Sequence, residues 1–296
     1  MSPRIDLHTH SRASDGTQSP TELMRAAAAA GLDVVALTDH DSTSGWDEAA
    51  VAAAASGVAL VRGLEISTRH DGLGVHLLGY LPDPTYPPLA AALDRILDGR
   101  TSRMPAVVAR LRAVGVDISE ADVVAEAGDS VATGRPHIAD ALVRLGVVAD
   151  RDEAFARFLT AGRPGYVDRY AADLREMVAT VVAAGGVPVI AHPWGRGNDL
   201  ADLGEEQLAG LAQQGLAGLE VDHQDHDEAS REALRGIARN LDLLVTGSSD
   251  HHGTGKVDHD LGCNTTDPDE LERLLDLATR HAQAAGVGAP TLLRPY

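Results

Sequence analysis

Short apolar segments recur along this chain and alternate with stretches of helical periodicity. Runs of a few Val, Ile and Leu residues bounded by Gly, Pro or Asp are typical of buried strands. Seven segments have this pattern: Arg4–Leu7, Asp33–Leu37, Val58–Ile66, Val75–Tyr80, Val187–Ile190, Leu216–Val221 and Leu243–Thr246. Ala-rich or Leu-rich helical stretches lie beside most of them, for example Pro20–Ala30, Trp46–Ala55 and Ala171–Ala184. Strands that alternate with helices predict a parallel sheet with helices outside it, and seven such repeats predict a barrel.

One stretch interrupts the alternation. Between residues 93 and 164 only helical patterns occur, at Leu93–Leu111, Ser119–Glu126, His137–Leu145 and Asp152–Ala161. Pro-rich and Gly-rich segments flank this stretch, which is typical of linkers. We therefore predict an α/β protein in which residues 1–92 and 165–296 form the barrel. Residues 93–164 are expected to form a small inserted helical domain over its mouth.

Composition narrows the class of protein. The chain has 296 residues and a net charge of −19, which disfavours a basic face for duplex nucleic acid. The single cysteine, Cys263, excludes an intrachain disulfide and a thiolate metal cluster. Neither a signal segment nor a long apolar run occurs, so we expect a cytoplasmic protein that does not attach to membranes.

Side chains that can bind metals gather near the ends of the predicted strands. Nine of them are candidate ligands: His8, His10, Asp15, His40, Glu65, His76, His192, Asp250 and His252. Taken singly, each has an ordinary alternative, such as a core or loop role for His192 before its proline. The C-terminal ends of barrel strands share one face, however, which favours a joint site. Nitrogen and oxygen ligands without cysteine suit Mn²⁺, Zn²⁺ or Fe²⁺, and nine ligands suffice for two or three ions.

The order of these motifs resembles a known family. His8-Thr9-His10, Thr38-Asp39-His40-Asp41, Glu65, His76, His192 and Asp250-His251-His252 are similar to the motifs of the polymerase-and-histidinol-phosphatase (PHP) superfamily of metal-dependent phosphoesterases. The resemblance covers most of the chain. It implies a distorted (β/α)7 barrel and a trinuclear metal site.

The resemblance also implies a role for each residue. One metal is expected on His8, His10, Glu65 and Asp250, a second on Glu65, His76 and His192, and a third on Asp15, His40 and His252. Asp39 and Asp41 are then expected to orient imidazoles. His251 is not expected to be a ligand. His70, His259 and His281 match no motif and are expected at the surface.

A narrower resemblance concerns the inserted segment. Arg100-Thr101-Ser102-Arg103 and Gly134-Arg135-Pro136-His137 are similar to a subgroup that hydrolyses nucleoside 3′,5′-bisphosphates and trims short RNA from its 5′ end. By position, Arg100, Arg103, Arg135 and His137 are expected to bind substrate phosphate. A solvated helix face is the alternative for the first two. His223 is a candidate proton donor or substrate contact.

The two resemblances together imply a hydrolase that cleaves a phosphate monoester of a small nucleotide. The expected substrate is the 3′-phosphate of a nucleoside 3′,5′-bisphosphate, with short 5′-phosphorylated RNA as a second substrate. His8, His10, Glu65 and Asp250 are expected to be catalytic because they hold the metals that activate the attacking water. We expect two or three divalent ions, with Mn²⁺ preferred over Zn²⁺ or Fe²⁺. The alternatives are a histidinol-phosphate phosphatase, a cyclic-phosphate phosphodiesterase and a non-catalytic metal-binding regulatory module.

Overall fold

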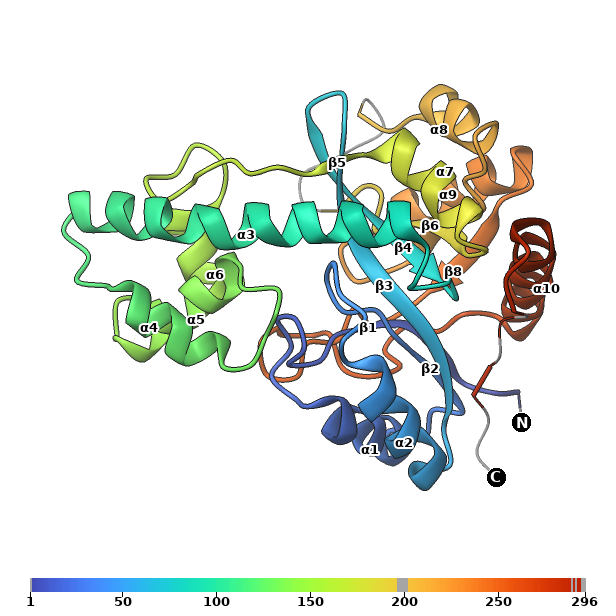
Figure 1. The fold of residues 1–296 in the computed structure, drawn as a ribbon, viewed down its shortest axis with the longest axis horizontal. Helices are drawn as coiled ribbons and strands as arrows, with labels where there is room; N and C mark the ends of the chain where they lie inside the picture. The colour runs from blue at the N-terminus through green and yellow to red at the C-terminus, as the bar shows by residue number, and fades with distance from the viewer. Residues whose placement is uncertain (1, 196–201, 289, 291, 294–296) are drawn as a thin grey trace.

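The computed structural model describes residues 2–195, 202–288, 290, 292 and 293. Seven strands form a nearly closed, barrel-shaped sheet, as expected from the sequence (Figure 1). In sheet order they are β1 (Ile5–Thr9), β2 (Val34–Leu37), β3 (Ala59–His70), β4 (Leu73–Tyr80), β6 (Val187–Ala191), β7 (Gly218–Asp222) and β8 (Leu244–Gly247). The predicted α/β barrel class is therefore confirmed.

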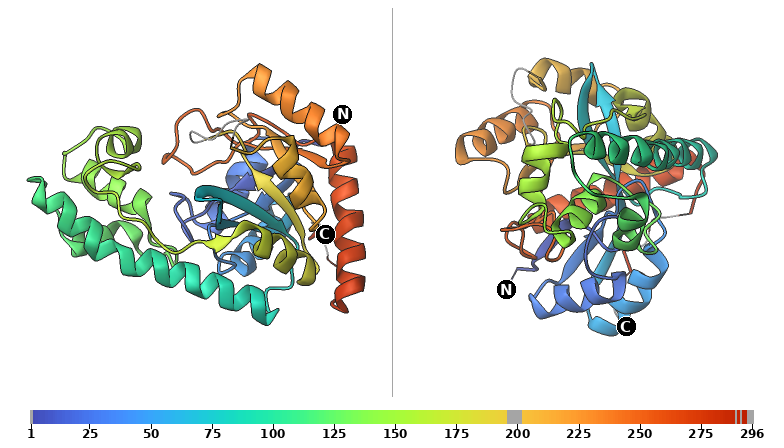
Figure 2. Two further views of the ribbon diagram at one scale, coloured as in Figure 1. Left: turned by 90° about the horizontal axis from the view of Figure 1, so that it is seen from above. Right: turned by 90° about the vertical axis from the view of Figure 1, so that its left-hand side faces the viewer.

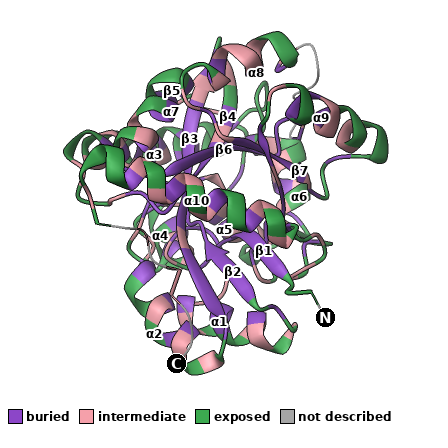
Figure 3. Cartoon of the chain, turned by 90° about the vertical axis from the view of Figure 1, so that its right-hand side faces the viewer, coloured by how far each residue is buried: buried purple, intermediate pink, exposed green. Residues whose placement is uncertain are grey.

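Helices surround this sheet. They are α1 (Pro20–Ala29), α2 (Trp46–Ser56), α7 (Leu174–Ala183), α8 (Glu205–Ala212), α9 (Glu228–Asn240) and α10 (Pro268–Ala285). Figure 3 shows the strands almost entirely buried, whereas the helices expose their outer faces. Local sequence explains where α1 begins and ends. Ser19 and Glu22 form a reciprocal capping box, and Gly31 follows the helix at φ +72°.

The sheet is not wholly parallel, so that part of the prediction is wrong. Strand β4 runs antiparallel to both of its neighbours, β3 and β6. The cause is the two-residue turn Asp71-Gly72, where both residues have positive φ and fold β3 back into a hairpin. Because β4 is reversed, its early residue His76 lies level with Ala191, at the end of β6. The reversal thus brings His76 to the face where the parallel strands end.

A short strand was not predicted. β5 (Ala172–Asp173) pairs with Thr68 and Arg69 of β3, where the sequence predicted the start of a helix. The Asp173 side chain accepts a hydrogen bond from the Glu176 backbone N–H and so caps α7. The helix therefore begins at Leu174.

Five helical segments lie between β4 and β5. They are α3 (Pro87–Ala113), α4 (Glu120–Ala127), α5 (Arg135–Arg144), α6 (Arg151–Ala154) and the π-helix η1 (Phe155–Leu159). Helix α3 extends from the barrel to the other four, which Figure 2 shows standing apart from the sheet. They share an apolar cluster of their own that includes Val107, Leu111, Val123, Ile138 and Leu142. The division at residues 93 and 164 stays a prediction, since α3 begins before it.

Hydrogen bonds join the first strand to the segments that follow the last strand of the barrel. Among the described residues, β1 and β8 share no continuous ladder. Instead, the buried Asp6 carboxylate accepts hydrogen bonds from the backbone N–H of Ser249 at 3.0 Å and of Gly262 at 2.9 Å. The His10 N–H donates to the His251 carbonyl at 2.8 Å. Asp6 therefore connects β1 to the segments that follow β8.

Within the ranges that the structure describes, no helix combines the length and the apolar character needed to cross a lipid bilayer.

The role of Asp6 can be tested by replacing it with alanine. Asp6→Ala leaves the buried Ser249 N–H and the partly buried Gly262 N–H without this acceptor, which should lower the free energy of unfolding by about 3 kcal/mol. Denaturant titration followed by circular dichroism measures this change. The matched control is Asp33→Ala, which removes an exposed acceptor of the Arg4 N–H. Equal destabilisation by both variants would contradict the role assigned to Asp6.

Candidate active site

All nine predicted ligands converge at one end of the barrel. Eight are buried, and His76 is partly exposed, with 17% of its side chain accessible. The Glu65 carboxylate lies at the middle of the group. Its Oε2 atom is 3.3 Å from His8 Nε2, 3.2 Å from His10 Nε2 and 3.1 Å from His40 Nδ1. Its Oε1 atom is 2.5 Å from His76 Nδ1 and 3.1 Å from His192 Nε2.

The side chains form overlapping groups. Three have donor atoms close enough to share an ion: His8 with His10, Glu65 and Asp250; His10 with Asp15, His40 and His252; and His40 with Glu65 and His76. Within each group the donor atoms lie within 4.8 Å of one another. The first group has the composition expected for one metal, and the second contains the three residues expected for another. Which ion each residue ligates stays a prediction.

The donors fit divalent cations. Glu65 Oε2 and His40 Nδ1 are buried and make no hydrogen bond, although imidazoles and carboxylates surround them. Buried polar atoms without hydrogen bonds are costly unless another partner, such as a metal, balances them. Several buried clusters of His, Asp and Glu therefore suit more than one divalent metal ion.

Local electrostatics prepare these groups for metals. Burial would raise the pKa of Glu65, but His76, His40 and His8 outweigh it and hold that pKa well below its usual range. Burial lowers the pKa of His252 to about 4, so its imidazole is neutral. Burial also opposes the charged form of His10, yet Asp250 and Glu65 raise its pKa to about 9. His10 must therefore lose a proton before it can ligate a metal.

Glu220 supports the centre from below and was given no role from the sequence. Its carboxylate accepts hydrogen bonds from His8 Nδ1 at 2.9 Å, from the His192 N–H at 2.8 Å and from the Ser248 hydroxyl. Burial would raise the pKa of Glu220, but His8 outweighs burial and lowers it. The bond to Nδ1 leaves Nε2 of His8 directed at Glu65. The feature of the sequence that could have indicated a role for Glu220 is its position as a charged residue inside the apolar strand 218–222.

Among the described residues, neither Asp39 nor Asp41 makes a direct hydrogen bond to an imidazole, so the expected direct contact is wrong. Asp39 is linked to an imidazole through the Ser14 hydroxyl, which lies 3.5 Å from His10 Nδ1. Asp39 accepts hydrogen bonds from the Ser11 N–H at 2.8 Å and the Ser14 hydroxyl at 2.5 Å. Asp41 accepts from the Ser67 N–H at 2.6 Å and from Arg100 Nε at 2.7 Å. Both carboxylates satisfy loop and strand donors beside the centre.

The Asp250 carboxylate contacts different groups through its two oxygens. Oδ1 lies 3.4 Å from His8 Nε2 and 3.2 Å from His10 Nε2. Oδ2 lies 3.3 Å from His223 Nε2 and 2.6 Å from Lys256 Nζ. The Asp225 N–H donates to Nδ1 of His223, which places the proton of the neutral imidazole on Nε2. His223 therefore donates to Asp250.

Two histidines expected at the surface are buried. His259 is 6% exposed and donates from Nδ1 to the Ser249 carbonyl, beside His223 and Asp250. His70 is 1% exposed and lies at the end of β3. His281 is partly buried and donates to the Gly186 carbonyl. A single sequence without strand direction could not place these side chains.

A cavity of about 600 Å³ opens from the metal-ligand cluster toward the inserted helices. Its barrel wall includes His40, His76, His192 and His252. Its other wall includes Arg100, Arg103, Arg135 and Phe155 from the inserted helices, and Tyr166 and Arg169 from the irregular segment after them. Arg100 is bonded to Asp41 and Ser67, and His137 accepts the Gly134 N–H at the start of α5. His137 is not among the residues that line this cavity. Phosphate binding by these two residues stays a prediction.

Three guanidinium groups make one wall of this cavity electropositive. Burial lowers the pKa of Arg103 to about 9, with Arg135 and Arg169 as the next causes. Arg135 lies over the rings of Phe155 and Tyr166, with its Cζ atom 5.5 and 5.7 Å from their centroids. Its Nη1 donates to the Leu159 carbonyl at 3.0 Å. Arg169 was missed from the sequence because it lies in an irregular segment after the inserted helices.

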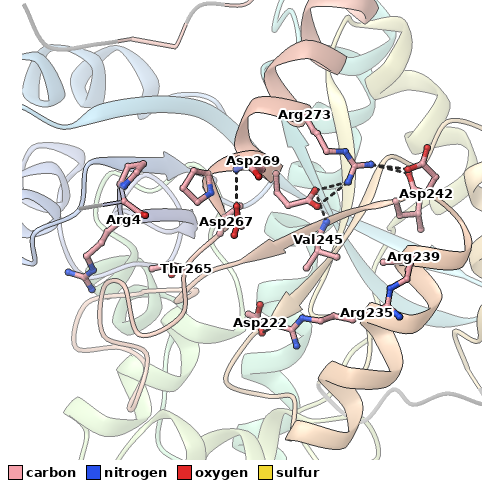
Figure 4. Close-up of a pocket in the computed structure, with 17 residues that line it drawn as sticks. Arg4, Asp222, Arg235, Arg239, Asp242, Val245, Thr265, Asp267, Asp269 and Arg273 are labelled. Carbon is pink, nitrogen blue, oxygen red and sulfur yellow. Dashed lines mark hydrogen bonds and ion pairs between the residues drawn. The ribbon is translucent and has the colours of Figure 1, made fainter.

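A larger cavity of about 830 Å³ lies elsewhere, beside α9 and α10 (Figure 4). Several of its charged side chains pair with one another: Arg235 with Asp222, and Arg273 with Asp242 and Glu270. None of the nine candidate ligands lines it. The smaller cavity is therefore the one connected to the chemistry.

Comparison with known proteins agrees with this geometry. Residues 6–126 match the PHP domain. A 3′,5′-nucleoside bisphosphate phosphatase of Chromobacterium violaceum is 38% identical over 87% of this chain and 90% of its own length. A 5′-3′ exoribonuclease of Haemophilus influenzae is 36% identical over 85% of this chain and 91% of its own. The solved structure of a candidate metal-dependent phosphoesterase from Bifidobacterium adolescentis superposes with a TM-score of 0.88 at 38% identity, covering 94% of this chain and 98% of the other.

The fold and the buried ligand cluster thus define a metal-dependent hydrolase that acts on phosphoester bonds. The chain belongs to the PHP family. The alternative of a non-catalytic metal-binding module is therefore set aside.

Metal uptake should release protons. Because the pKa of His10 is about 9, its imidazole carries a proton at neutral pH without metal. Mn²⁺ affinity should therefore rise between pH 6.5 and 9, by about tenfold per pH unit for each proton displaced. Calorimetry at pH 7 in two buffers of different ionisation enthalpy measures the protons released. A buffer-independent heat would contradict this expectation.

Glu220→Gln tests the support beneath the centre. The amide keeps the size of the side chain but weakens the bonds to His8 Nδ1 and the His192 N–H. Metal affinity should fall by about 10–100-fold, measured by titration with Mn²⁺. Glu228→Gln, at the exposed start of α9, is the control and should leave affinity unchanged. Wild-type affinity in Glu220→Gln would exclude this role.

Proposed function

We propose that this enzyme removes the 3′-phosphate from nucleoside 3′,5′-bisphosphates and also acts on short 5′-phosphorylated RNA. One observation carries the proposal: a single cavity has metal-capable ligands at one end and Arg103, Arg135 and Arg169 on its opposite wall. The end with the metal ligands suits the phosphate that is cleaved, and the wall with the arginines suits a phosphate that is retained. A volume of about 600 Å³ is in the range of small-molecule sites.

The residues divide the work as follows. The nine ligands would hold two or three divalent ions, for which we propose Mn²⁺. When bound, such ions lower the pKa of water and neutralise charge on the phosphoryl oxygens. His8, His10, Glu65 and Asp250 are the proposed catalytic ligands. Arg103, Arg135 and Arg169 bind the retained phosphate, because guanidinium groups match phosphate oxygens with two parallel hydrogen bonds.

His223 acts through Asp250 in this proposal. Its side chain is fully buried and does not line the cavity, so it does not reach the leaving oxygen directly. The Nε2–H bond to Asp250 Oδ2 fixes the direction of that carboxylate. His223 is therefore a positioning residue.

The named activities of two relatives support the substrate class. The C. violaceum protein is a nucleoside bisphosphate phosphatase, and the H. influenzae protein is an exoribonuclease. Nucleoside bisphosphates and RNA both contain phosphate esters, and the net charge of −19 disfavours duplex binding. Nucleotides of this kind occur inside the cell, so a cytoplasmic location is part of the proposal.

A substrate panel with Mn²⁺ tests the function. The panel contains adenosine 3′,5′-bisphosphate, adenosine 3′-monophosphate, short 5′-phosphorylated RNA, histidinol phosphate and a cyclic phosphate. The bisphosphate should exceed the monophosphate in kcat/KM by about tenfold or more, since its second phosphate gains charge-assisted hydrogen bonds. Higher kcat/KM for histidinol phosphate or the cyclic phosphate would overturn the proposal.

Arg135→Ala separates recognition from chemistry. The variant should raise KM for adenosine 3′,5′-bisphosphate by about tenfold or more while changing little with p-nitrophenyl phosphate, which has no second phosphate. Arg157→Ala is the matched control because Arg157 lies on η1, packs over Phe158 and does not line the cavity. Equal effects of Arg135→Ala on both substrates would refute the phosphate-binding role.

A further inference from the structure

Lys256 is the only lysine in the chain, and the other 24 basic residues are arginines. Where arginine is used so consistently, a single lysine marks a position that requires a compact ammonium group. That position lies at the cavity, close to His252 and Asp225, which also line it. The side chain is 24% exposed, so its ammonium group can meet a bound molecule.

The segment that carries Lys256 is closely fitted to its surroundings. Gly253 has φ +66°, and a Cβ atom there would collide with the Thr17 hydroxyl. A Cβ atom at Gly255 would collide with the Arg151 guanidinium. Arg151 in turn donates to the Asp15 carbonyl and pairs with Asp140. The two glycines thus let the segment lie against the N-terminal loop and α6, which fixes where Lys256 begins.

The ammonium group contacts the Asp250 oxygen that faces away from His8 and His10. Nζ is 2.6 Å from Oδ2, while Oδ1 faces His8 and His10. Oδ2 already accepts from His223 Nε2. Orienting Asp250 therefore does not require a second, charged donor, and Nζ has further hydrogens to donate.

The charges around Lys256 indicate which kind of group accepts hydrogen bonds from its remaining N–H groups. With divalent cations on the ligand cluster, the single charge of the Asp250 carboxylate offsets only part of the repulsion between them and the ammonium group, and a bound anion that contacts both would offset more of it. The anion that this enzyme must bind there is the phosphoryl group of its substrate. A tetrahedral oxyanion could contact the metal-ligand end and Nζ together.

We propose that Lys256 is a catalytic residue that donates a hydrogen bond to a non-bridging oxygen of the phosphoryl group being cleaved. In the reaction, the oxygen of water forms a new P–O bond and loses a proton, the P–O bond to the leaving group breaks, and the leaving oxygen takes up a proton, so the products are an alcohol and inorganic phosphate. Lys256 keeps its proton throughout and stabilises charge that grows on the phosphoryl oxygens. The inference rests on the proposed metal centre but not on the identity of the nucleoside.

The test compares Lys256→Met with Lys256→Arg in the full-length Mn²⁺-loaded enzyme. Lys256→Met should lower kcat by about 10²–10³-fold on p-nitrophenyl phosphate and on adenosine 3′,5′-bisphosphate alike. Lys256→Arg should restore part of the loss, since it keeps the charge but not the shape. Thr254→Ala is the control, because Thr254 lies in the same segment but does not line the cavity, and it should retain wild-type activity.

Two measurements do not depend on turnover. Metal content by mass spectrometry should be unchanged in Lys256→Met, whereas calorimetric affinity for inorganic phosphate should fall by about tenfold or more. Lost metal with unchanged phosphate affinity would overturn the proposal and make Lys256 a support for Asp250. Unchanged kcat and phosphate affinity would overturn it as well.

The result can be read independently of the substrate proposal. If the wild type hydrolyses p-nitrophenyl phosphate but not nucleoside bisphosphates, the substrate proposal fails. The Lys256 comparison then still applies to the simple ester and to phosphate binding. Arg135→Ala should affect only the bisphosphate, whereas Lys256→Met should affect both substrates equally.

Discussion

The whole centre depends on one buried carboxylate. Glu65 has no solvent exposure, and five imidazoles lie around its two oxygens. A charge in such a place is expensive unless cationic partners compensate it. Strand β3 brings this charge to the end of the barrel, and the imidazoles that balance it come from β1, from β4 and from the residues directly after β1, β2 and β6. The barrel therefore has to compensate a buried negative charge, which apolar packing alone cannot do.

Several other buried carboxylates hold the ligands and the neighbouring segments in place through hydrogen bonds, each to a different part of the fold. Glu220 holds His8 and the backbone of His192, and Asp6 joins β1 to the segments after β8. Asp41 balances Arg100 where α3 crosses the barrel mouth. These bonds link the centre to the sheet beneath it and to the helix above it. Precise placement of ligands thus comes from hydrogen bonds that are fully enclosed by the core.

Much of this could be read from the sequence, for physical reasons. The ligands near β1, β2, β6 and β8 follow apolar runs, so period-two alternation and a shared barrel face were enough to group them. The direction of β4 was missed, although Asp71-Gly72 is a hairpin signal between two apolar runs. Glu220 and Arg169 could be given no role because their partners are distant in sequence. Lys256 drew no notice, since a lysine in a loop is ordinary until the surrounding groups are known.

The π-helix η1 lets one wall of the cavity change independently of the metal ligands. Its Phe155 ring and Leu159 carbonyl both hold Arg135, so the wider turn determines where that guanidinium lies in the cavity. Deleting one residue there would restore α-helical winding and rotate the following side chains by about 100°. The metal ligands all come from outside this segment and would keep their positions. A one-residue deletion in η1 would therefore move the wall that holds Arg135 while leaving the metal ligands in place.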